Sequence, residues 1–388
     1  MESWHIYILL VVAIGCGWWL GRRGFSTSDG GAADVQYYES LNHLLNDRPE
    51  LAGSSLIESL EVSPVTLETH FALAGLLRRR GELEKAVEVH ENILKRPDLD
   101  AGVVRHTQLE LAQDFLLAGL LDRAEDLLLK LSQDHQARRE SLSLLLQIHE
   151  RERQWLRAIS VARDLATGDD GVAYDHRISH YYCELAEQSL AKGGLEDAHL
   201  QVTSAMGYDN SNARASLVAG ELYLAQERYE ECARVLERIR EQDPVHVSAS
   251  LSNLREAYER GGLPVEDLQR HLTESLETVP AISIVLELAR LQREVLGDHG
   301  MSRLIANHLK RNPTIRGLSQ LIDLHMDNTD GVARENLSIL RSFAEALVAD
   351  KPAYRCQDCG FDGKALRWQC PSCHEWGSVR PIFGLEGE

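Results

Sequence analysis

Residues 75–90 read GLLRRRGELEKAVEVH, and this stretch decides the fold of most of the chain. Apolar residues recur at helical spacing on both sides of Gly81, which marks a turn between two helices. Ala86 follows five residues later, at a point where a small side chain lets two antiparallel helices approach closely. The stretch therefore predicts a helix–turn–helix unit.

The same unit recurs along the chain. The small residues that mark the close-packed point of successive second helices are separated by 34, 38, 34, 40 and 34 residues, and these markers are Ala52, Ala86, Ala124, Ala158, Ala198 and Cys232. Twelve residues before each stands a first-helix marker, and these are Ser40, Ala74, Ala112, Leu146, Ala186 and Gly220. The inter-helix turns and repeat ends are marked by Gly81, Gly119, Gly193, Pro64, Pro97 and Pro244. A period of about 34 residues is typical of tetratricopeptide repeats.

Beyond Asp243 the small-residue markers are lost, although helix-breaking residues continue. Helix pairs are still punctuated by Gly261–Gly262, Gly297, Gly300 and Pro313. We expect two or three degenerate repeats there, ending in a long helix from about Gly331 to Ala349 that Pro352 stops. The sequence thus predicts an all-α tetratricopeptide solenoid over residues 35–350.

Two C-x-x-C pairs follow the array and contain four of the seven cysteines, Cys356, Cys359, Cys370 and Cys373. Each pair suits a tight turn that presents two sulfurs to one point. Four thiolates can then close a tetrahedral site around Zn²⁺ or iron. We predict that these cysteines hold one metal ion in a small domain at residues 351–388. Disulfides are not expected, because the upstream sequence indicates a reducing compartment.

The N-terminus predicts a membrane anchor. Residues 4–20 read WHIYILLVVAIGCGWWL, which as a helix is about 25 Å long and just crosses a bilayer core. No basic residue precedes this run, so a cleavable signal peptide is not expected. Arg22–Arg23 follow it, and the positive-inside rule then places the rest of the chain in the cytoplasm. We predict a single-pass inner-membrane anchor at residues 1–21 and a flexible linker at residues 22–34.

Charge and motifs argue against several classes of function. The chain has 41 basic and 60 acidic side chains, a formal charge of −19, which disfavours a nucleic-acid partner. It contains neither a P-loop nor a G-x-S-x-G motif. Surface or capping roles, not catalysis, are expected for the pairs Asp134–His135, Asp175–His176 and Asp298–His299, and a solvated helix end is expected for Arg78–Arg80. Cys183 and Cys232 are expected to be small buried residues. We predict no catalytic residue and no enzymatic activity.

The combination of anchor, repeats and four-cysteine knuckle resembles the lipopolysaccharide assembly protein B family over essentially the whole length. The matching stretches are GLLRRRGELEKAVEVH (75–90), HYYCELA (180–186), YRCQDCGF (354–361) and WQCPSCHEW (368–376). The resemblance implies an inner-membrane adaptor of Gram-negative bacteria. Such an adaptor promotes degradation of the lipid A-committing deacetylase by a membrane AAA+ protease and organises other lipopolysaccharide-assembly proteins. It also implies a rubredoxin-type metal site, with iron or zinc held by Cys356, Cys359, Cys370 and Cys373.

One departure from a rubredoxin concerns the residue after each cysteine pair. A rubredoxin has glycine at both places, whereas here Gly360 follows the first pair and His374 follows the second. The hydrogen bonds that tune the sulfurs of an electron-transfer iron are therefore in doubt, and a structural role is favoured. Some of the aromatic residues of the small domain are expected to pack against the last helices of the array, and the candidates are Tyr354, Phe361, Trp368 and Trp376.

The sequence leaves two rival functions open. One is a rubredoxin-like electron-transfer protein, which would need a reversible iron couple and a docking partner. The other is a general tetratricopeptide co-chaperone, which would need basic side chains on inner helix faces to bind peptide carboxylates. The choice between iron and zinc, homo-oligomerisation, and the face that binds each partner are not determined by the sequence.

Overall fold

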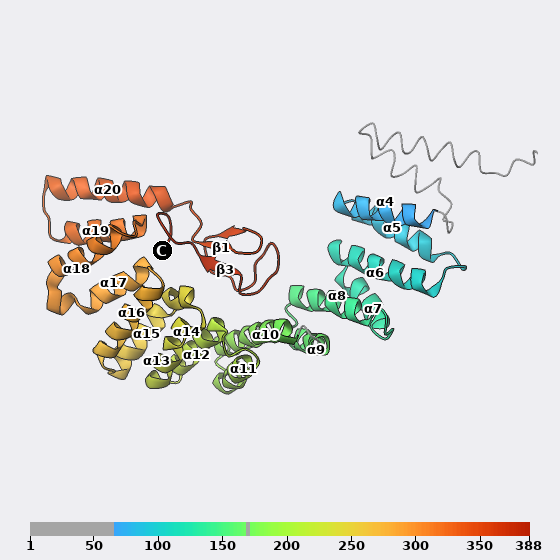
Figure 1. Ribbon diagram of the computed structural model, residues 1–388, viewed down its shortest axis with the longest axis horizontal. Coiled ribbons are helices and arrows are strands. Elements are labelled where there is room, and N and C mark those ends of the chain that lie inside the picture. Colours follow the sequence, from blue (N-terminus) through green and yellow to red (C-terminus); the bar gives the residue numbers. More distant parts are fainter. Residues whose placement is uncertain (1–65, 168–170) are drawn as a thin grey trace, which may run out of the picture. The chain divides into compact units, whose positions relative to one another are not determined.

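The computed structural model describes residues 66–167 and 171–388, in two compact units divided between Ile148 and His149 (Figure 1). The predicted anchor at residues 4–20 and linker at residues 22–34 lie outside the described residues, as do the markers Ser40, Ala52 and Pro64. Within the described ranges, no helix combines the length and the hydropathy that a membrane span requires.

The first unit is a stack of antiparallel helices. Its helices are α4 (Leu67–Arg79), α5 (Leu83–Leu94), α6 (Ala101–Leu117), α7 (Leu121–Leu131) and α8 (Arg138–Arg151), the last of which passes into the second unit at His149. Consecutive helices from α4 to α7 contact one another. The array prediction is thus confirmed here.

Arg78 corrects one expectation for the first unit. Its guanidinium is not solvated but only 14% exposed, with Nε 2.6 Å from Oδ1 of the fully buried Asp114. Nη2 lies 2.7 Å from Glu110 Oε2, and His90 Nδ1 lies 2.6 Å from the other oxygen of Asp114. Arg78 therefore joins α4 to α6, because the next helix pair brings two carboxylates to the end of α4.

The second unit continues the helical stack. It contains α9 (Trp155–Leu165), α10 (Gly171–Ala191), α11 (Leu195–Tyr208), α12 (Ala213–Ala225), α13 (Tyr229–Glu237), α14 (Ile239–Gln242), the 3-10 helix η1 (Pro244–His246), α15 (Val247–Gly261), α16 (Val265–Thr278), α17 (Ile282–Leu291), α18 (Arg293–Leu309), α19 (Ile315–Asp327) and α20 (Val332–Val348). Within this unit the helices from α10 to α20 follow an arc (Figure 1).

The described small-residue markers lie at helix contacts, as predicted. The second-helix markers are all 0% exposed, and they are Ala86, Ala124, Ala158, Ala198 and Cys232. Of the first-helix markers, Ala74, Ala112 and Ala186 are 0% exposed and Leu146 is 2% exposed. At Gly220 an added Cβ would lie 2.5 Å from Leu236 Cδ2, so only glycine fits there without movement of that leucine. The markers spaced by about 34 residues therefore lie where the helices pack closely.

The turn five residues before each second-helix marker is left-handed in every described repeat. Gly81, Gly119 and Gly193 have φ values of 80°, 75° and 78°. The equivalent residues of the other two repeats, Arg153 and Glu227, have φ values of 56° and 58°. Non-glycine residues rarely adopt this conformation, so the pairing of the helices imposes it.

Three helix pairs follow Asp243, in agreement with the two or three degenerate repeats expected. They are α15 with α16, α17 with α18, and α19 with α20. Gly262 caps α15 with a φ of 62°. Gly297 interrupts the helix as predicted, because its non-helical backbone (φ 62°, ψ 177°) divides α18 into two helical segments at a kink. Helix α20 matches the long helix expected from Gly331 to Ala349.

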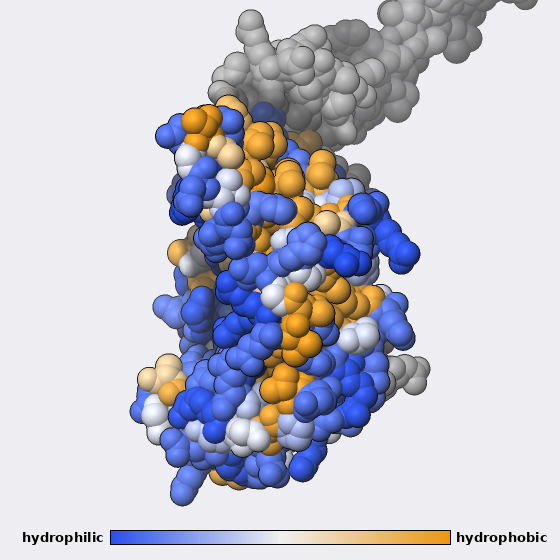
Figure 2. Space-filling model, turned by 90° about the vertical axis from the view of Figure 1, so that its left-hand side faces the viewer, coloured by the Kyte–Doolittle hydropathy of each residue, from blue (hydrophilic) through white to orange (hydrophobic). Residues whose placement is uncertain are grey.

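The outer surface of the last helix pair is unusually apolar. Figure 2 shows apolar side chains on this side of the second unit. On α20 they are 52–72% exposed, and they are Val332, Ile339, Leu340, Phe343 and Leu347. The array therefore ends without the polar outer face that terminal capping repeats usually have.

The small C-terminal domain is a three-stranded antiparallel ribbon. Strand β1 (Tyr354–Cys356) lies between β2 (Asp362–Gly363) and β3 (Val379–Pro381). Its buried core is tiny and consists of Cys356, Cys370 and Val379. The ribbon lies on the inside of the arc formed by α10 to α20 (Figure 1). The interface between the ribbon and the array, called the seam below, lies wholly within the second unit.

Candidate metal centre

The ribbon brings the four predicted cysteines together. Their sulfur atoms all lie within 4.8 Å of one another. Sγ of Cys356 is 3.7 Å from Sγ of Cys373, and Sγ of Cys359 is 3.6 Å from Sγ of Cys370. A disulfide would need about 2.05 Å, whereas a tetrahedral ion with metal–sulfur bonds of about 2.3 Å separates its sulfurs by about 3.8 Å. The four free thiols thus fit one metal ion.

The two cysteine pairs form matching turns. In each turn, the amide of the first cysteine donates to the carbonyl five residues on, and the amide four residues on donates back. In the first turn, the Cys356 amide donates to the Phe361 carbonyl at 2.8 Å, and the Gly360 amide donates to the Cys356 carbonyl at 3.1 Å. In the second turn, the Cys370 amide donates to the Glu375 carbonyl and the His374 amide donates to the Cys370 carbonyl, both at 2.9 Å. The halves of the site are therefore equivalent in backbone structure.

His374 forms the same kind of backbone turn as the glycine of the first pair. Its φ is 62°, close to the 75° of Gly360, so the second turn keeps the left-handed conformation. Histidine is among the residues that tolerate this region best. The substitution therefore changes the side chain but not the path of the backbone around Cys373.

The first turn favours thiolates. Burial raises the pKa of Cys356, but hydrogen bonds from Ser378 and from the amides of Cys359 and Asp358 outweigh this and bring the pKa to about 6. The amide of Phe361 lowers the pKa of Cys359. Because the thiolate is the form that binds a metal, these hydrogen bonds prepare the sulfurs for an ion.

Trp376 anchors the ribbon to the middle of the array. Its ring is 6% exposed, and its centroid lies 5.9 Å from that of Trp155, 5.7 Å from that of Tyr181 and 5.1 Å from that of His180. Its indole Nε1 donates to Glu150 Oε1 at 3.0 Å, and the Tyr181 hydroxyl donates to the same oxygen. Trp376 is therefore not among the aromatic residues that pack on the last helices, because its partners lie on α8, α9 and α10.

Trp368 extends this contact toward η1. Its ring centroid lies 4.9 Å from that of His246 and 6.0 Å from that of His180. The guanidinium of Arg214 lies 5.9 Å from the Trp368 centroid and 5.8 Å from the Trp376 centroid. Both distances suit cation–π attraction, which is strongest when the cation is shielded from water. The two tryptophans thus cover a polar patch of the array.

Arg214 is neutralised from α10. Its side chain is 2% exposed, and Nη2 lies 2.7 Å from Glu184 Oε1 and 2.9 Å from Glu187 Oε1. Burial raises the pKa of Glu187, although the charge of Arg214 opposes this. A buried cation needs such partners, because its desolvation is otherwise costly.

Charged pairs at the edge of the seam complete the docking. Arg177 Nη2 lies 2.8 Å from Glu375 Oε1 of the ribbon, and its Nη1 lies 3.9 Å from Glu150. Arg380 Nη1 lies 2.9 Å from Asp243 Oδ1. These pairs set the orientation of the ribbon and are expected to add little stability where they are exposed.

A close approach of the ribbon backbone to the array also fixes the position of the ribbon. Gly377 has a φ of 67°, and an added Cβ would lie 3.1 Å from His176 Nε2. His176 itself pairs with Asp209 at 2.7 Å, not with its sequence neighbour Asp175. Likewise, Asp134 pairs with Arg105 and Asp298 with Arg293. The adjacent Asp–His pairs thus make structural contacts with other parts of the fold.

The seam also contains polar residues that the sequence did not single out. Their pairing depends on helices brought together only by the fold, so no spacing in the sequence identifies them. They are Glu150, His180, Arg214 and His246. The pKa of His180 is held well below its usual range, first by burial and then by the positive charge of Arg214. His180 therefore stays neutral under the tryptophans.

Comparison with known proteins supports both parts of the architecture. A family profile described as "Rubredoxin metal binding domain" matches residues 354–381, and a "Tetratricopeptide repeat" profile matches residues 189–255. Lipopolysaccharide assembly protein B of Escherichia coli strain K12 is 32% identical over 387 residues, which cover 98% of this chain and 99% of that protein. The chain belongs to the lipopolysaccharide assembly protein B family.

A second relative has the same family name. Lipopolysaccharide assembly protein B of Haemophilus influenzae is 24% identical over 396 residues, covering 98% of each protein. Among solved structures, a tetratricopeptide repeat protein from Parabacteroides merdae covers 67% of this chain and 99% of its own, at 12% identity and a TM-score of 0.35. In this member of the lipopolysaccharide assembly protein B family, the knuckle and the repeats form one continuous body within the second unit.

Proposed function

We propose that this chain is a non-enzymatic, membrane-tethered adaptor that regulates lipopolysaccharide assembly. The proposal rests on membership of the lipopolysaccharide assembly protein B family and on one structural observation, the burial of Trp376 against the array. A ribbon that is docked through its own tryptophans is suited to shape a binding surface. An exchangeable electron carrier would instead be expected to keep such surface free for its redox partners.

The proposed layout follows the sequence boundaries. Residues 1–21 form a single-pass inner-membrane anchor, residues 22–34 a linker, residues 35–350 the array and residues 351–388 the metal domain. The bulk of the chain lies on the cytoplasmic side. The array binds the membrane AAA+ protease, the lipid A deacetylase and other assembly proteins that the family resemblance implies.

The metal domain holds one ion, iron or zinc, through Cys356, Cys359, Cys370 and Cys373. When bound, the ion joins the two cysteine turns and supplies folding free energy that the tiny core cannot. The chain's own residues do the rest. Trp368 and Trp376 cover the polar patch around Arg214, while Glu150 orients the indole of Trp376.

The mechanism is proximity. A membrane anchor confines the array to a thin layer beside the bilayer, where a membrane protease and its client meet at raised effective concentration. The polar groups of the seam support a scaffold role. Glu150, Arg177 and Asp243 bind their partners across the seam in a fixed arrangement, which fits positioning and not turnover.

The test is to supply the chain to Escherichia coli depleted of its own lipopolysaccharide assembly protein B. The full chain should restore normal levels of the deacetylase and of lipopolysaccharide, measured by immunoblot and by lipid A quantification. A variant lacking residues 1–23 should stay folded but restore them poorly at equal abundance, because it has lost its confinement to the membrane.

A matched control replaces residues 4–20 with an unrelated single membrane span. Function restored by this replacement supports proximity as the mechanism. If the truncated chain controls the deacetylase as well as the full chain does, the proximity mechanism is wrong.

A second candidate function is electron transfer, which two observations favour. Cys359 is exposed, so one ligand of the site faces solvent. The turn at His374 also keeps the left-handed conformation of the turn at Gly360. Iron-loaded protein should then show a reversible one-electron couple by voltammetry. Full adaptor activity of the zinc-loaded protein, or the absence of such a couple, excludes this candidate.

A further inference from the structure

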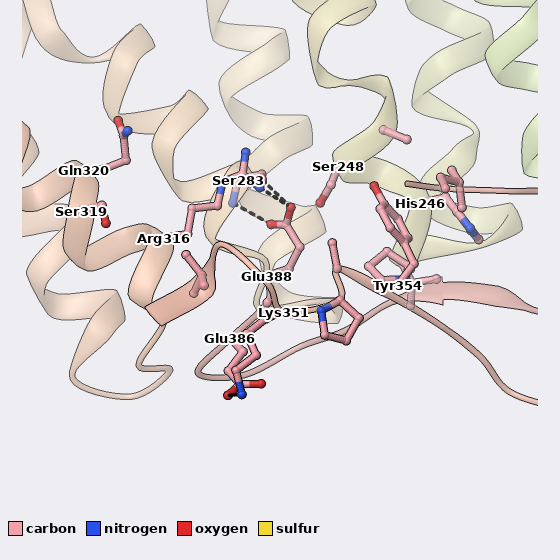
Figure 3. A pocket seen from close by; sticks show the side chains of 18 of the residues that line it. His246, Ser248, Ser283, Arg316, Ser319, Gln320, Lys351, Tyr354, Glu386 and Glu388 are labelled. Carbon is pink, nitrogen blue, oxygen red and sulfur yellow. Dashed lines mark hydrogen bonds and ion pairs between the residues drawn. The ribbon is translucent and has the colours of Figure 1, made fainter. Parts of the chain in front are cut away.

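A carboxylate-binding site lies at the N-terminal end of α17 (Figure 3). It is occupied by the side chain of Glu388. Oε1 of Glu388 lies 2.7 Å from Arg316 Nη1 and accepts from Ser283 Oγ at 2.7 Å, while Oε2 accepts from Ser283 N at 3.1 Å. The N-cap residue of α17, Ala281, offers no side-chain oxygen. The carboxylate thus satisfies a helix-end amide and an arginine together.

The segment that delivers Glu388 is held by its polar groups. The carbonyl of Leu385 accepts from the Ile315 amide at 2.8 Å, and Glu386 Oε1 lies 2.7 Å from Lys351 Nζ. Its apolar side chains contribute less, since Phe383 is 37% exposed and Leu385 is 59% exposed. A segment held in this way offers two carboxylates and a backbone carbonyl to the array and to Lys351 just after it, and another acidic peptide can present the same groups.

Space for a longer peptide lies next to this segment. A cavity of about 510 Å³ adjoins Glu388, which is within the range of small-ligand sites. Its walls come from the array, the linker after α20 and the ribbon. The polar part is lined by Ser248, Ser319 and Gln320, and the ribbon contributes Tyr354, Leu366 and Pro381. The site is therefore complete only while the ribbon is docked.

We propose that this groove binds an acidic peptide segment of a partner protein, with two carboxylates two residues apart, and that residues 385–388 occupy it in cis. The incoming carboxylates take the places of Glu386 on Lys351 and of Glu388 on Arg316 and Ser283. The inference rests on the proposed adaptor function and specifies how it binds a partner. Because a tethered segment has an effective concentration in the millimolar range, it suppresses weak ligands and admits tighter ones.

The direct test measures binding of labelled peptides to the metal-loaded full chain in detergent, by fluorescence anisotropy. The acidic probe is IFGLEGE, the sequence of residues 382–388, acetylated and amidated. The control probe is IFGLQGQ with the same blocked ends. We expect the acidic probe to bind at least about tenfold more tightly to Glu388→Gln than to the unaltered chain, because the cis carboxylate no longer competes.

A second variant locates the binding. Arg316→Gln in the Glu388→Gln background should weaken the acidic probe about tenfold or more, while Arg303→Gln, an exposed arginine on α18, should leave it unchanged. Thermal unfolding of each variant checks that the fold is intact. The proposal is overturned if Glu388→Gln gives no gain, if the two probes bind equally, or if the change at Arg316 has no effect in folded protein.

The result is separable from the fate of the adaptor proposal. Failure of these binding measurements while the full chain still restores deacetylase control removes the acidic-peptide site and leaves the adaptor function standing. Failure of the full chain to restore that control contradicts the adaptor function, whatever the peptide data show.

Discussion

Two arginines, one in each unit, are both neutralised by carboxylates from neighbouring helices, but their surroundings differ. In the first unit, Arg78 is neutralised by Asp114 and Glu110 from the next helix pair. In the second unit, Arg214 is likewise neutralised by two glutamates from a neighbouring helix, but Trp368 and Trp376 of the ribbon also cover it. Exposure of the side chain falls from 14% at Arg78 to 2% at Arg214.

The difference shows what the ribbon adds to a repeat array. Helix pairs alone can neutralise a charged side chain, but they leave it partly exposed to solvent. The ribbon excludes water from the patch around Arg214 and His180, which strengthens its charge pairs and also makes the loss of any partner more costly. Stability of the second unit should therefore depend on the ribbon, whereas that of the first should not.

Loss of a cysteine ligand should have the largest effect. Cys370→Ser should release the metal, unfold the ribbon and expose both tryptophans, because the three buried residues of its core are too few to hold it. Metal analysis, tryptophan emission and hydrogen exchange measure the outcome. Protection should fall in α9 to α12, while residues 66–148 keep theirs. Unchanged protection of α9 to α12 after metal loss would mean that the ribbon is an independent module.

Truncation of the anchoring tryptophan should come next. Trp376→Ala removes the contacts with Trp155, His180 and Tyr181 and should cost the second unit about 3–5 kcal/mol, measured by urea unfolding. Trp376→Phe is the matched control, since it keeps most of the packing but loses the hydrogen bond to Glu150. It should cost about 1–3 kcal/mol, because the hydrogen bond from the indole to the Glu150 carboxylate is lost, although the Tyr181 hydroxyl still donates to the same oxygen. Equal losses for both variants would assign the energy to the hydrogen bond alone.

Overpacking the repeat markers should have a moderate effect in both units. Ala124→Leu and Ala158→Leu each insert a side chain at a fully buried helix contact and should cost about 1–3 kcal/mol. Only Ala158→Leu should also shift tryptophan emission, because α9 carries Trp155 of the seam. His135→Gln, at an exposed position, should change stability by less than about 0.5 kcal/mol. A loss of activity in His135→Gln without loss of the fold would revive a functional role for the histidines.

Acid should have the smallest effect near neutrality. His180 is neutral in the folded protein because its pKa is depressed by burial and by Arg214, with His176, His246 and Asp209 also nearby. Unfolded histidine binds a proton near pH 6.5, so stability is fully present above that pH and falls below it, by up to about 1.4 kcal/mol per pH unit. Urea unfolding between pH 7.5 and 5.5 measures the slope. His180→Phe should reduce it, and an unchanged slope would contradict the assignment.

Sequence reasoning predicted the features that repeat or that concentrate one residue type. The markers from Ala86 to Cys232 and the four cysteines are of this kind, since local packing or metal chemistry fixes their spacing. The seam was not predictable, because Trp376 and its partner Glu150 lie 226 residues apart and neither belongs to a periodic pattern. Left-handed turns at Arg153 and Glu227 were missed for a related reason. There the conformation is imposed by helix pairing, and the residue type gives no sign of it.

The separation of Glu150 and Trp376 in the sequence also sets the time between the synthesis of these two partners on the ribosome. Ribosomes add roughly 5–20 residues per second, so the 226 residues between the two partners take about 10–45 s to appear. From the synthesis of Arg214 until that of Trp376, the patch around Arg214 and His180 in the nascent array is open to water and to chaperones. Contacts of such long range also slow the final docking step. The array is therefore synthesised before the ribbon that covers its polar patch.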